Sequence, residues 1–112
     1  MHVQKQIWSN RFVYLFVTEG GSVQLDIYQE HQDDNIYAYI HHLYVDEDCR
    51  RKGIAKELLD AAENLAKQKG KDAVYLDYVE EYTPQWMYDY YIRRGYKCVE
   101  STSKYSLMKF TF

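Results

Sequence analysis

Between residues 36 and 79 the spacing of the apolar residues changes twice, and this limits the fold more than any other feature of the chain. Residues 36–45, "IYAYIHHLYV", are almost continuously apolar and β-prone, which is typical of a strand covered on both faces. From Gly53 to Lys69 the apolar residues fall at helical spacing, and Gly70 is a natural stop. Residues 72–79, "DAVYLDYV", are strand-like again. This order predicts a βαβ unit, whose two strands are expected to run parallel.

The predicted helix has two different sides. Its apolar side is expected to consist of Ile54, Leu58, Ala62, Leu65 and Ala66. Its polar side is expected to consist of Lys56, Glu57, Asp60, Glu63, Asn64 and Lys67. A helix of this kind buries one stripe and exposes the other.

The rest of the chain is predicted to contain mainly strands and turns. The expected elements are a strand over 11–18, a turn at Gly20 and Gly21, a return strand over 22–30, a turn over 31–35, a helix over 84–94 and a strand pair over 96–101 and 104–112. No element is predicted in the first ten residues. The fold class is therefore α/β: a mixed, mostly antiparallel sheet with a central parallel strand pair and two main helices.

Length and composition exclude several classes of protein. The 112 residues suffice for one compact domain, 1–112, and are too few for two. A net charge of −3 argues against a nucleic-acid binder, and no apolar run approaches the roughly 20 residues of a membrane span. The start of the chain lacks the apolar core of a signal peptide. Cys49 and Cys98 fit neither a metal pattern nor a disulfide framework, so we expect free thiols in the cytoplasm.

Positive charge gathers where the long helix is predicted to begin. Arg50, Arg51 and Lys52 stand directly before Gly53, and Lys56 follows in the first turn. Cations are unfavourable at a helix N-terminus unless an anion offsets them, because the helix dipole is positive there. The free N–H groups of the first turn and a glycine that lets a ligand approach favour a phosphate or diphosphate site. The alternative is that these side chains are ordinary solvated cations.

The pattern around Gly53 is neither a P-loop nor a dinucleotide fingerprint. Arg50-x-x-Gly53-x-Ala55, five residues after a central strand, resembles the acetyl-CoA pyrophosphate loop of the GNAT-superfamily N-acetyltransferases, which has the pattern Gln/Arg-x-x-Gly-x-Gly/Ala. "YYIRRGYK", residues 90–97, resembles the second signature of that family, an aromatic pair followed by glycine and an aromatic. The resemblance covers about residues 36–100.

This resemblance implies a cofactor site. The central strand is expected to splay from its parallel neighbour, and the pantetheine arm of acetyl-CoA would pair with the strand backbone in that gap. The residues expected to bind the cofactor are Leu43, Tyr44 and Val45 on the strand, Arg50, Arg51, Lys52, Gly53, Ile54, Ala55 and Lys56 in the loop, and Arg94. For Arg94 the alternatives are a CoA phosphate contact and a solvated helix end. No metal is expected.

The resemblance also implies a reaction, direct acetyl transfer from the thioester to a primary amine through a tetrahedral intermediate. Tyr91 matches the family's frequent acid for the leaving thiolate, and a phenol is protonated at neutral pH. His41 lies four residues before Val45, hence on the same strand face if alternation is regular, and is the candidate base. His42 would point to the opposite face and be structural. The alternative for Tyr91 is packing of its helix on the sheet. The alternative for His41 is a hydrogen-bonded strand histidine, and many enzymes of the family need no single base.

The chain also departs from the family pattern. The family usually carries a first strand and one or two helices before the hairpin, which build the acceptor side of the cleft, whereas this chain has about ten residues there. Pro84 replaces an Asn that contacts the cofactor in many relatives. The apolar faces of residues 11–30 and the segment "YTPQWMYDYY" are expected to lack cover, which favours a homodimer. The alternative is an open sheet that receives a large protein substrate. The acidic residues Asp33, Asp34, Glu80 and Glu81 either attract a cationic acceptor or are solvated.

Two functions remain open at this point. The first is a small acetyl-CoA-dependent N-acetyltransferase acting on a small amine or on an amine of a protein or peptide. The second is a non-catalytic or weakly catalytic acyl-CoA-binding or protein-interaction module of the same fold. The sequence does not name the acceptor.

Overall fold

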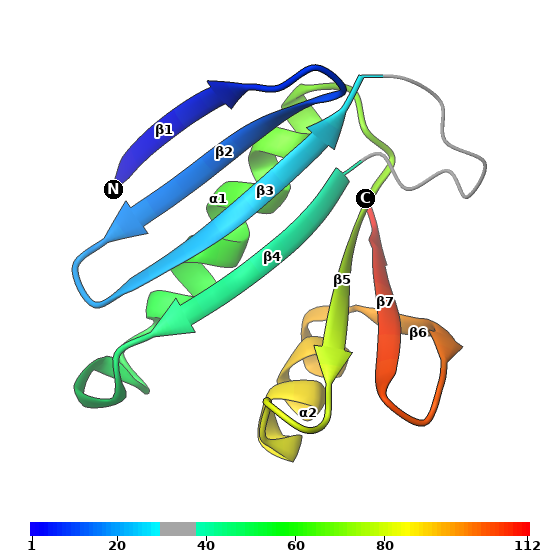
Figure 1. Cartoon of the computed structure of the whole chain (residues 1–112). Coiled ribbons are helices and arrows are strands. Elements are labelled where there is room, and N and C mark those ends of the chain that lie inside the picture. The colour runs from blue at the N-terminus through cyan, green and yellow to red at the C-terminus, as the bar shows by residue number, and fades with distance from the viewer. Residues whose placement is uncertain (30–37) are drawn as a thin grey trace.

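The computed structural model describes residues 1–29 and 38–112. Within these ranges seven strands form one sheet in the order β1-β2-β3-β4-β5-β7-β6 (Figure 1). The elements are β1 His2–Ile7, β2 Arg11–Thr18, β3 Gly21–Tyr28, β4 Ala38–Val45, the 3-10 helix η1 Glu47–Cys49, α1 Ile54–Gln68, β5 Ala73–Val79, α2 Gln85–Arg94, β6 Lys97–Ser101 and β7 Tyr105–Thr111. Only the β4–β5 pair is parallel among the strand pairs of the described residues. The predicted fold class is thus confirmed.

The predicted elements agree with the observed ones to within a few residues. The strands expected over 11–18 and 72–79 are β2 and β5, and the helix expected over 84–94 is α2. The last residue of the strand predicted over 22–30, the turn predicted over 31–35 and the first two residues of the strand predicted over 36–45 lie outside the described residues.

The first strand was not predicted from the sequence. β1 pairs antiparallel with β2 along its whole length, from His2 opposite Val17 to Ile7 opposite Phe12. All six of its residues are exposed, so its sequence shows no regular apolar alternation. Three residues, 8–10, join β1 to β2, and the Trp8 amide donates to the Arg11 carbonyl at 2.9 Å. Within the described chain, no helix therefore lies between β1 and β2, in agreement with the shortness of this region relative to the family pattern.

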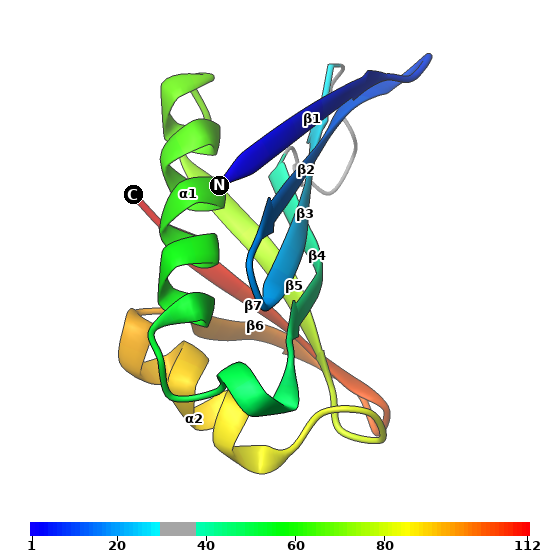
Figure 2. The ribbon, with the colours of Figure 1, turned by 90° about the vertical axis from the view of Figure 1, so that its left-hand side faces the viewer.

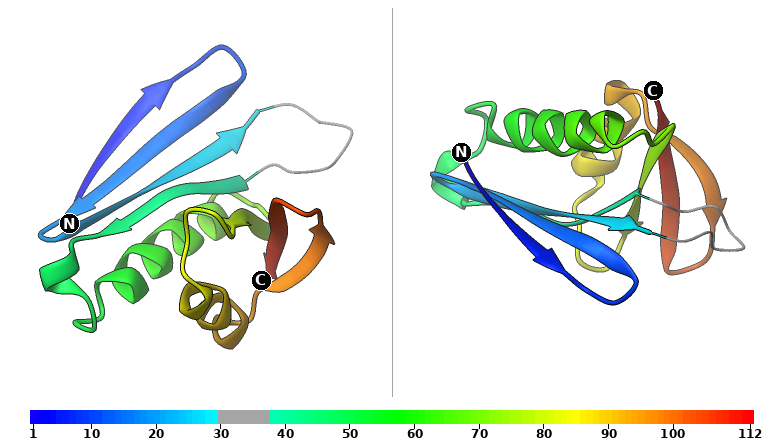
Figure 3. Two further views of the ribbon diagram at one scale, coloured as in Figure 1. Left: turned by 60° about the horizontal axis from the view of Figure 1, so that its bottom comes forward. Right: turned by 90° about the horizontal axis from the view of Figure 1, so that it is seen from above.

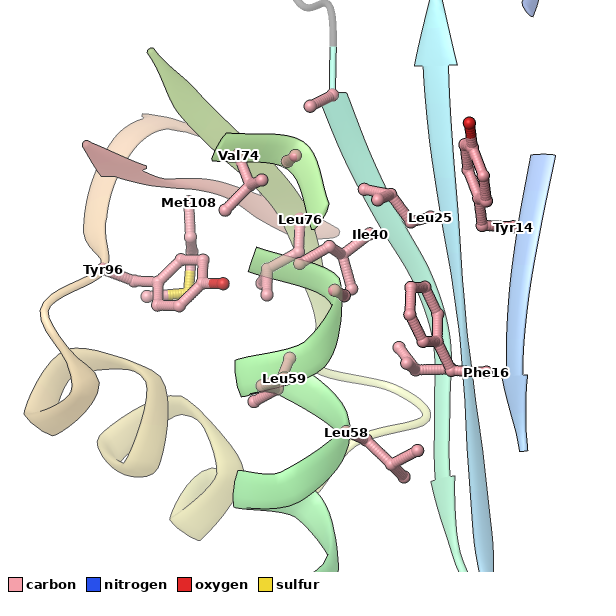
Figure 4. Close-up of a cluster of buried hydrophobic side chains, with 14 of the residues drawn as sticks. Tyr14, Phe16, Leu25, Ile40, Leu58, Leu59, Val74, Leu76, Tyr96 and Met108 are labelled. Atoms are coloured by element: carbon pink, nitrogen blue, oxygen red, sulfur yellow. The ribbon is translucent and has the colours of Figure 1, made fainter. Parts of the chain in front are cut away.

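The hydrophobic core lies between the sheet and α1 (Figure 4). Leu25 of β3, Ile40 of β4 and Leu76 of β5 point toward Leu58 and Leu59 of α1, and all five are buried. We call this side of the sheet the helix face; it is formed by Tyr14, Phe16, Val23, Leu25, Ile27, Ala38, Ile40, Val74, Leu76 and Met108. α1 and α2 both lie on this side (Figures 2 and 3).

The opposite side, which we call the open face, carries no helix within the described residues (Figure 2). Paired residues of antiparallel strands share a face, so the register places a second set of side chains here. They include Val13, Leu15, Gln24, Asp26, Tyr39 and His41. Successive residues of β3 thus point alternately to the helix face and to the open face.

Two sequence-based expectations about burial are wrong. The apolar residues of 11–30 were expected to lack cover, yet Phe16, Val23 and Leu25 are buried because α1 packs on them. Glu63 was expected on the polar side of α1, yet it is only 6% exposed. It is buried because it lies on the part of α1 that meets α2, where it contacts Arg94.

Candidate functional site

A cleft opens between the two parallel strands. β4 and β5 pair at two positions, Tyr39 with Tyr75 and Ile40 with Leu76, and then diverge toward their carboxyl ends (Figure 1). The space between them has a volume of about 420 Å3. Its lining comes from β4, β5, the loop after β5 and α2, and includes His41, His42, Leu43, Asp77, Tyr82 and Tyr91. The splaying expected of the parallel pair is confirmed.

The three strand residues expected to bind the cofactor lie beyond the last β4–β5 pair. Leu43 borders the cleft. Tyr44 and Val45 pair with Ser22 and Gly21 of β3, and β4 has no pair with β5 after Ile40 in the described register. The β5 side of the Leu43–Val45 backbone is therefore available to an extended ligand that adds to the strand edge.

A β-bulge interrupts β4 at the cleft. Gln24 of β3 pairs with His41, but Ser22 pairs with Tyr44, so β4 carries one residue more than β3 over this stretch. His42 has a positive φ of 54°. The bulge shifts the alternation of the side chains, so His41 shares its face with Tyr44 and not with Val45. The expectation that His41 and Val45 share a face is therefore wrong. His42, expected to be structural, is exposed and borders the cleft as well.

The cationic loop lies at the end of the sheet where β4 and β5 diverge (Figures 1 and 2). Gly53 is the N-cap of α1 with a φ of 78°, and Arg51 has a φ of 66°. No side chain caps the first turn of α1, and the cations Arg50, Arg51, Lys52 and Lys56 are all exposed. Ile54 and Ala55 are half-buried where the helix begins. An uncapped helix start with exposed cations can bind an anion.

The turn between β2 and β3 supports this loop. The Asp46 amide donates to the Gly20 carbonyl at 2.7 Å. A Cβ atom at Gly21 would lie 2.8 Å from the Tyr44 carbonyl oxygen and 2.8 Å from the Ile54 side chain. Only glycine leaves room for the loop to pack this closely on the turn, a contact that the sequence did not indicate.

Tyr91 is buried in α2 and borders the cleft. Its ring packs near the rings of Tyr90 and Tyr96, with centroids 6.3 and 5.7 Å away. Burial, with a smaller contribution from Tyr90, raises the pKa of Tyr91 to about 12. The phenol therefore keeps its proton throughout the neutral range, as a proton donor must. Tyr91 therefore has the packing role that the sequence left open, while its role as an acid stays a prediction.

Arg94 joins the two helices. Its Nη2 atom lies 2.6 Å from Glu63 Oε1 and 2.8 Å from Asp60 Oδ1, and the Tyr96 hydroxyl donates to Glu63 Oε2 at 2.7 Å. Burial lowers the pKa of Arg94, but the bonds to Glu63 and Asp60 outweigh it and raise the pKa overall. Asp60 also pairs with Lys56 at 2.8 Å. The contact of Arg94 with a CoA phosphate stays a prediction, and these ion pairs give the side chain a structural role.

A cluster of charged side chains that the sequence did not indicate lies on the open face. Asp26 is 3% exposed, with Arg11 Nε 3.1 Å and His41 Nε2 3.3 Å from its Oδ2 atom. Gln24 Nε2 donates to its Oδ1 atom at 2.8 Å. No spacing rule could find this cluster, because its members come from three strands whose register is set by pairing.

The described residues hold no group of three or more His, Cys, Asp or Glu side chains placed to bind a metal ion. None of the helices in the described chain is long and apolar enough to cross a membrane.

Comparison with known proteins decides the family. A sequence model of the acetyltransferase (GNAT) family matches residues 5–96. The chain belongs to this family. Members of the GNAT family use acetyl-CoA, in agreement with the resemblance found from the loop and the aromatic pair. No curated protein sequence matches the chain.

Solved structures of GNAT acetyltransferases share the fold. PaiA N-acetyltransferase from Thermoplasma acidophilum, in complex with coenzyme A, is 20% identical with a TM-score of 0.70, over 92% of this chain and 62% of that one. An acetyltransferase from Bacillus cereus is 22% identical with a TM-score of 0.69, over 91% and 73%. A Bacillus anthracis protein in complex with acetyl coenzyme A is 19% identical with a TM-score of 0.69, over 94% and 64%. This chain thus spans less than two thirds of the PaiA and Bacillus anthracis proteins.

Proposed function

We propose that residues 1–112 form a single-domain, acetyl-CoA-dependent N-acetyltransferase that transfers the acetyl group directly to a primary amine. One observation carries the proposal. The cleft formed where β4 and β5 diverge lies beside the cationic start of α1, and Tyr91 is part of its wall. This arrangement provides an anion site and a protonated phenol at one end of one sheet.

The cationic loop is the proposed site of the cofactor's diphosphate. The amides of the loop and first helical turn, residues 51–56, would donate to the phosphate oxygens, and the exposed cations would offset their charge. The unpaired edge of Leu43–Val45 would bind the amide groups of the pantetheine arm.

Tyr91 and His41 are the proposed acid and base. Acetyl-CoA supplies the acetyl group as a thioester. The Tyr91 hydroxyl gives its proton to the departing thiolate sulfur, and the His41 imidazole accepts a proton from the amine, directly or through water. Both side chains border the same cleft, one from α2 and the other from β4.

The acceptor we propose is a primary amine, small or on a protein, that carries a positive charge before it reacts. Asp77 borders the cleft, and Glu80 and Glu81 line a second hollow of about 630 Å3. The two hollows share Val79 and Tyr82. The other two acidic residues considered for this role, Asp33 and Asp34, lie outside the described residues.

A second candidate is an acyl-CoA-binding or protein-interaction module with little or no turnover. It is favoured by the direct β1–β2 connection, which leaves the acceptor side of the cleft without a helix in the described residues. Both candidates bind CoA, so only turnover with an amine distinguishes them.

Calorimetry with CoA tests the loop assignment, with two glycine variants of equal backbone strain. Gly53 and Gly70 stand at opposite ends of α1 with φ of 78° and 82°, and an added Cβ meets nothing within 4 Å at either position. Gly53→Glu places a negative charge at the proposed diphosphate site and should reduce CoA affinity at least tenfold. Gly70→Glu should leave it unchanged. Equal affinity for both variants would place the cofactor elsewhere.

Release of free thiol from acetyl-CoA, followed over a panel of amines and lysine peptides, tests the activity itself. Acceptor-dependent release by the parent, with acetylated amine found by mass spectrometry, is expected. CoA binding with no release for any acceptor would favour the second candidate.

We propose a homodimer in the cytoplasm as the working form. The apolar residues of 11–30 no longer support a dimer, because α1 covers the strand residues expected to be bare. The support now comes from β1, an edge strand whose residues are all exposed, with Val3 at 46% and Ile7 at 75%, and from Trp8 directly after it at 50%. Both cysteines are free, which suits a reducing compartment. A monomer mass by light scattering across a dilution series would refute the dimer.

A further inference from the structure

Asp26 is a buried carboxylate on the face of the sheet that lacks a helix. It lies mid-strand in β3 and is 3% exposed, although its neighbour Leu25 points to the core on the other side. A buried charge costs free energy unless partners surround it. Here the partners reach the carboxylate from three strands: Arg11 from β2, Gln24 from β3 and His41 from β4.

The pairing keeps the carboxylate ionised. Burial raises the pKa of Asp26, but contacts with His41, Gln24 and Arg11 outweigh burial and lower it overall. Neither Arg11 Nε nor His41 Nε2 is aligned for a hydrogen bond with any described group, although both lie within 3.3 Å of Oδ2. Both nitrogen atoms nevertheless lie close to the Asp26 carboxylate, which faces the Nε2 side of the His41 ring.

His41 connects this cluster to the cleft. Of the four side chains in the cluster, it is the only one that also borders the space between β4 and β5. Its ring stacks on Tyr39 with centroids 4.3 Å apart and planes inclined by 21°. The Tyr39 hydroxyl in turn donates to Asp77 of β5. The imidazole is thus held from one side by a stacked ring and from another by a carboxylate.

We propose that Asp26 is a positioning residue for His41: it faces the Nε2 side of the ring, leaves Nδ1 as the proton acceptor, and stabilises the charge that the ring gains. Arg11 shares the carboxylate and has the opposite influence. The role of His41 as a base in acetyl transfer rests on the proposed function, whereas the influence of Asp26 on the ring does not. During the step the proton moves from the amine nitrogen to Nδ1, and Asp26 stays ionised.

Other charged and titratable groups around His41 must be held constant in a test. They are Tyr39 and His42 on β4, Asp77 on β5 and Tyr91 on α2, in addition to Arg11 and Asp26. The test therefore uses two single variants, one that removes the negative charge of Asp26 and one that removes the positive charge of Arg11. Each variant leaves Tyr39, His42, Asp77 and Tyr91 unchanged.

The experiment is an NMR titration of the His41 ring in the full chain for the parent, Asp26→Asn and Arg11→Gln. Asp26→Asn removes the negative charge, so the midpoint should move to lower pH by about 0.5–1 unit. Arg11→Gln removes the positive charge, so the midpoint should move to higher pH by a similar amount. Asp72→Asn, an exposed carboxylate outside the cleft, is the matched control and should move nothing.

Opposite shifts support the proposal, and equal or absent shifts overturn it. If Asp26→Asn does not fold, the upward shift in Arg11→Gln decides alone. The acid limb of the kcat/KM profile for amine acetylation should move with the NMR midpoint in each variant. If the acid limb of the kcat/KM profile stays fixed while the NMR midpoint of His41 moves, the cluster has only a structural role. A parent without any thiol release would refute the proposed function, while the titration would still decide whether Asp26 controls the ring.

Discussion

Leu25 and Asp26 are neighbours on β3 and are both almost completely buried, yet they have different roles on opposite faces of the sheet. Leu25 packs on α1 with the other apolar residues of the helix face. Asp26 holds Arg11 and His41 on the open face, at the border of the cleft. The comparison teaches that burial by itself does not distinguish stability from chemistry.

The largest expected effect is on the helix face. Leu25→Ala should lower the free energy of unfolding by about 2–5 kcal/mol, because it leaves a cavity beneath α1. Leu15→Ala, on the half-buried open face, should cost about 1 kcal/mol. Urea unfolding measures both. Equal losses would show that the open face is packed as tightly as the core.

Tyr91→Phe separates packing from chemistry on α2. The variant keeps the ring in the core and loses only the hydroxyl, so kcat should fall about 100-fold with CoA affinity unchanged. Tyr14→Phe, a buried tyrosine on β2 away from the cleft, is the control and should retain full kcat. Unchanged turnover in Tyr91→Phe would leave the residue with its packing role alone.

Alkaline pH should weaken the helix face. The pKa of Tyr91 is raised from 10.0 to about 12, so its contribution to stability is complete below pH 10 and is lost as the pH rises through 12. The loss from this residue should be about 3 kcal/mol. Urea unfolding of the parent and Tyr91→Phe from neutral pH upward measures it. The same alkaline slope in both would contradict the assignment.

Acid should weaken the open face, by a smaller amount. The pKa of Asp26 is lowered from 3.8, so its contribution is present above that value and is lost as the pH falls through the folded-state pKa. The effect is small because burial opposes the favourable contacts. In Asp26→Asn the free energy of unfolding should depend less on pH in this acid range, while Asp72→Asn should behave as the parent. A parent-like acid slope in Asp26→Asn would place the acid-sensitive group elsewhere.

Local patterns predicted most of the fold and the cationic start of α1. The helical spacing of Leu58 and Ala62 and the alternation of Val23 and Leu25 each report one amphipathic surface, and all four side chains are buried. Gly53, placed between three cations and the first apolar residue of the helical pattern, marks the uncapped start of α1. These features are short-range, so a sequence pattern suffices to find them.

Long-range pairing decided what the patterns missed. β1 was missed because an exposed edge strand has no apolar stripe. Glu63 has the spacing of a surface residue, but α2 brings Arg94 against it. The bulge at His42 reversed the predicted face of Val45 relative to His41, because one extra residue in β4 shifts every side chain beyond it.

The sequence by itself therefore determined the βαβ unit, the two helices and the cationic helix start, since each depends on residues close together in the chain. Only the tertiary structure decided where His41 points and which groups surround it. That depends on the register of three strands, and Arg11, Asp26 and His41 meet only when β2, β3 and β4 are paired. Side chains separated in sequence acquire a common electrostatic environment only after the backbone hydrogen bonds of the sheet fix their positions.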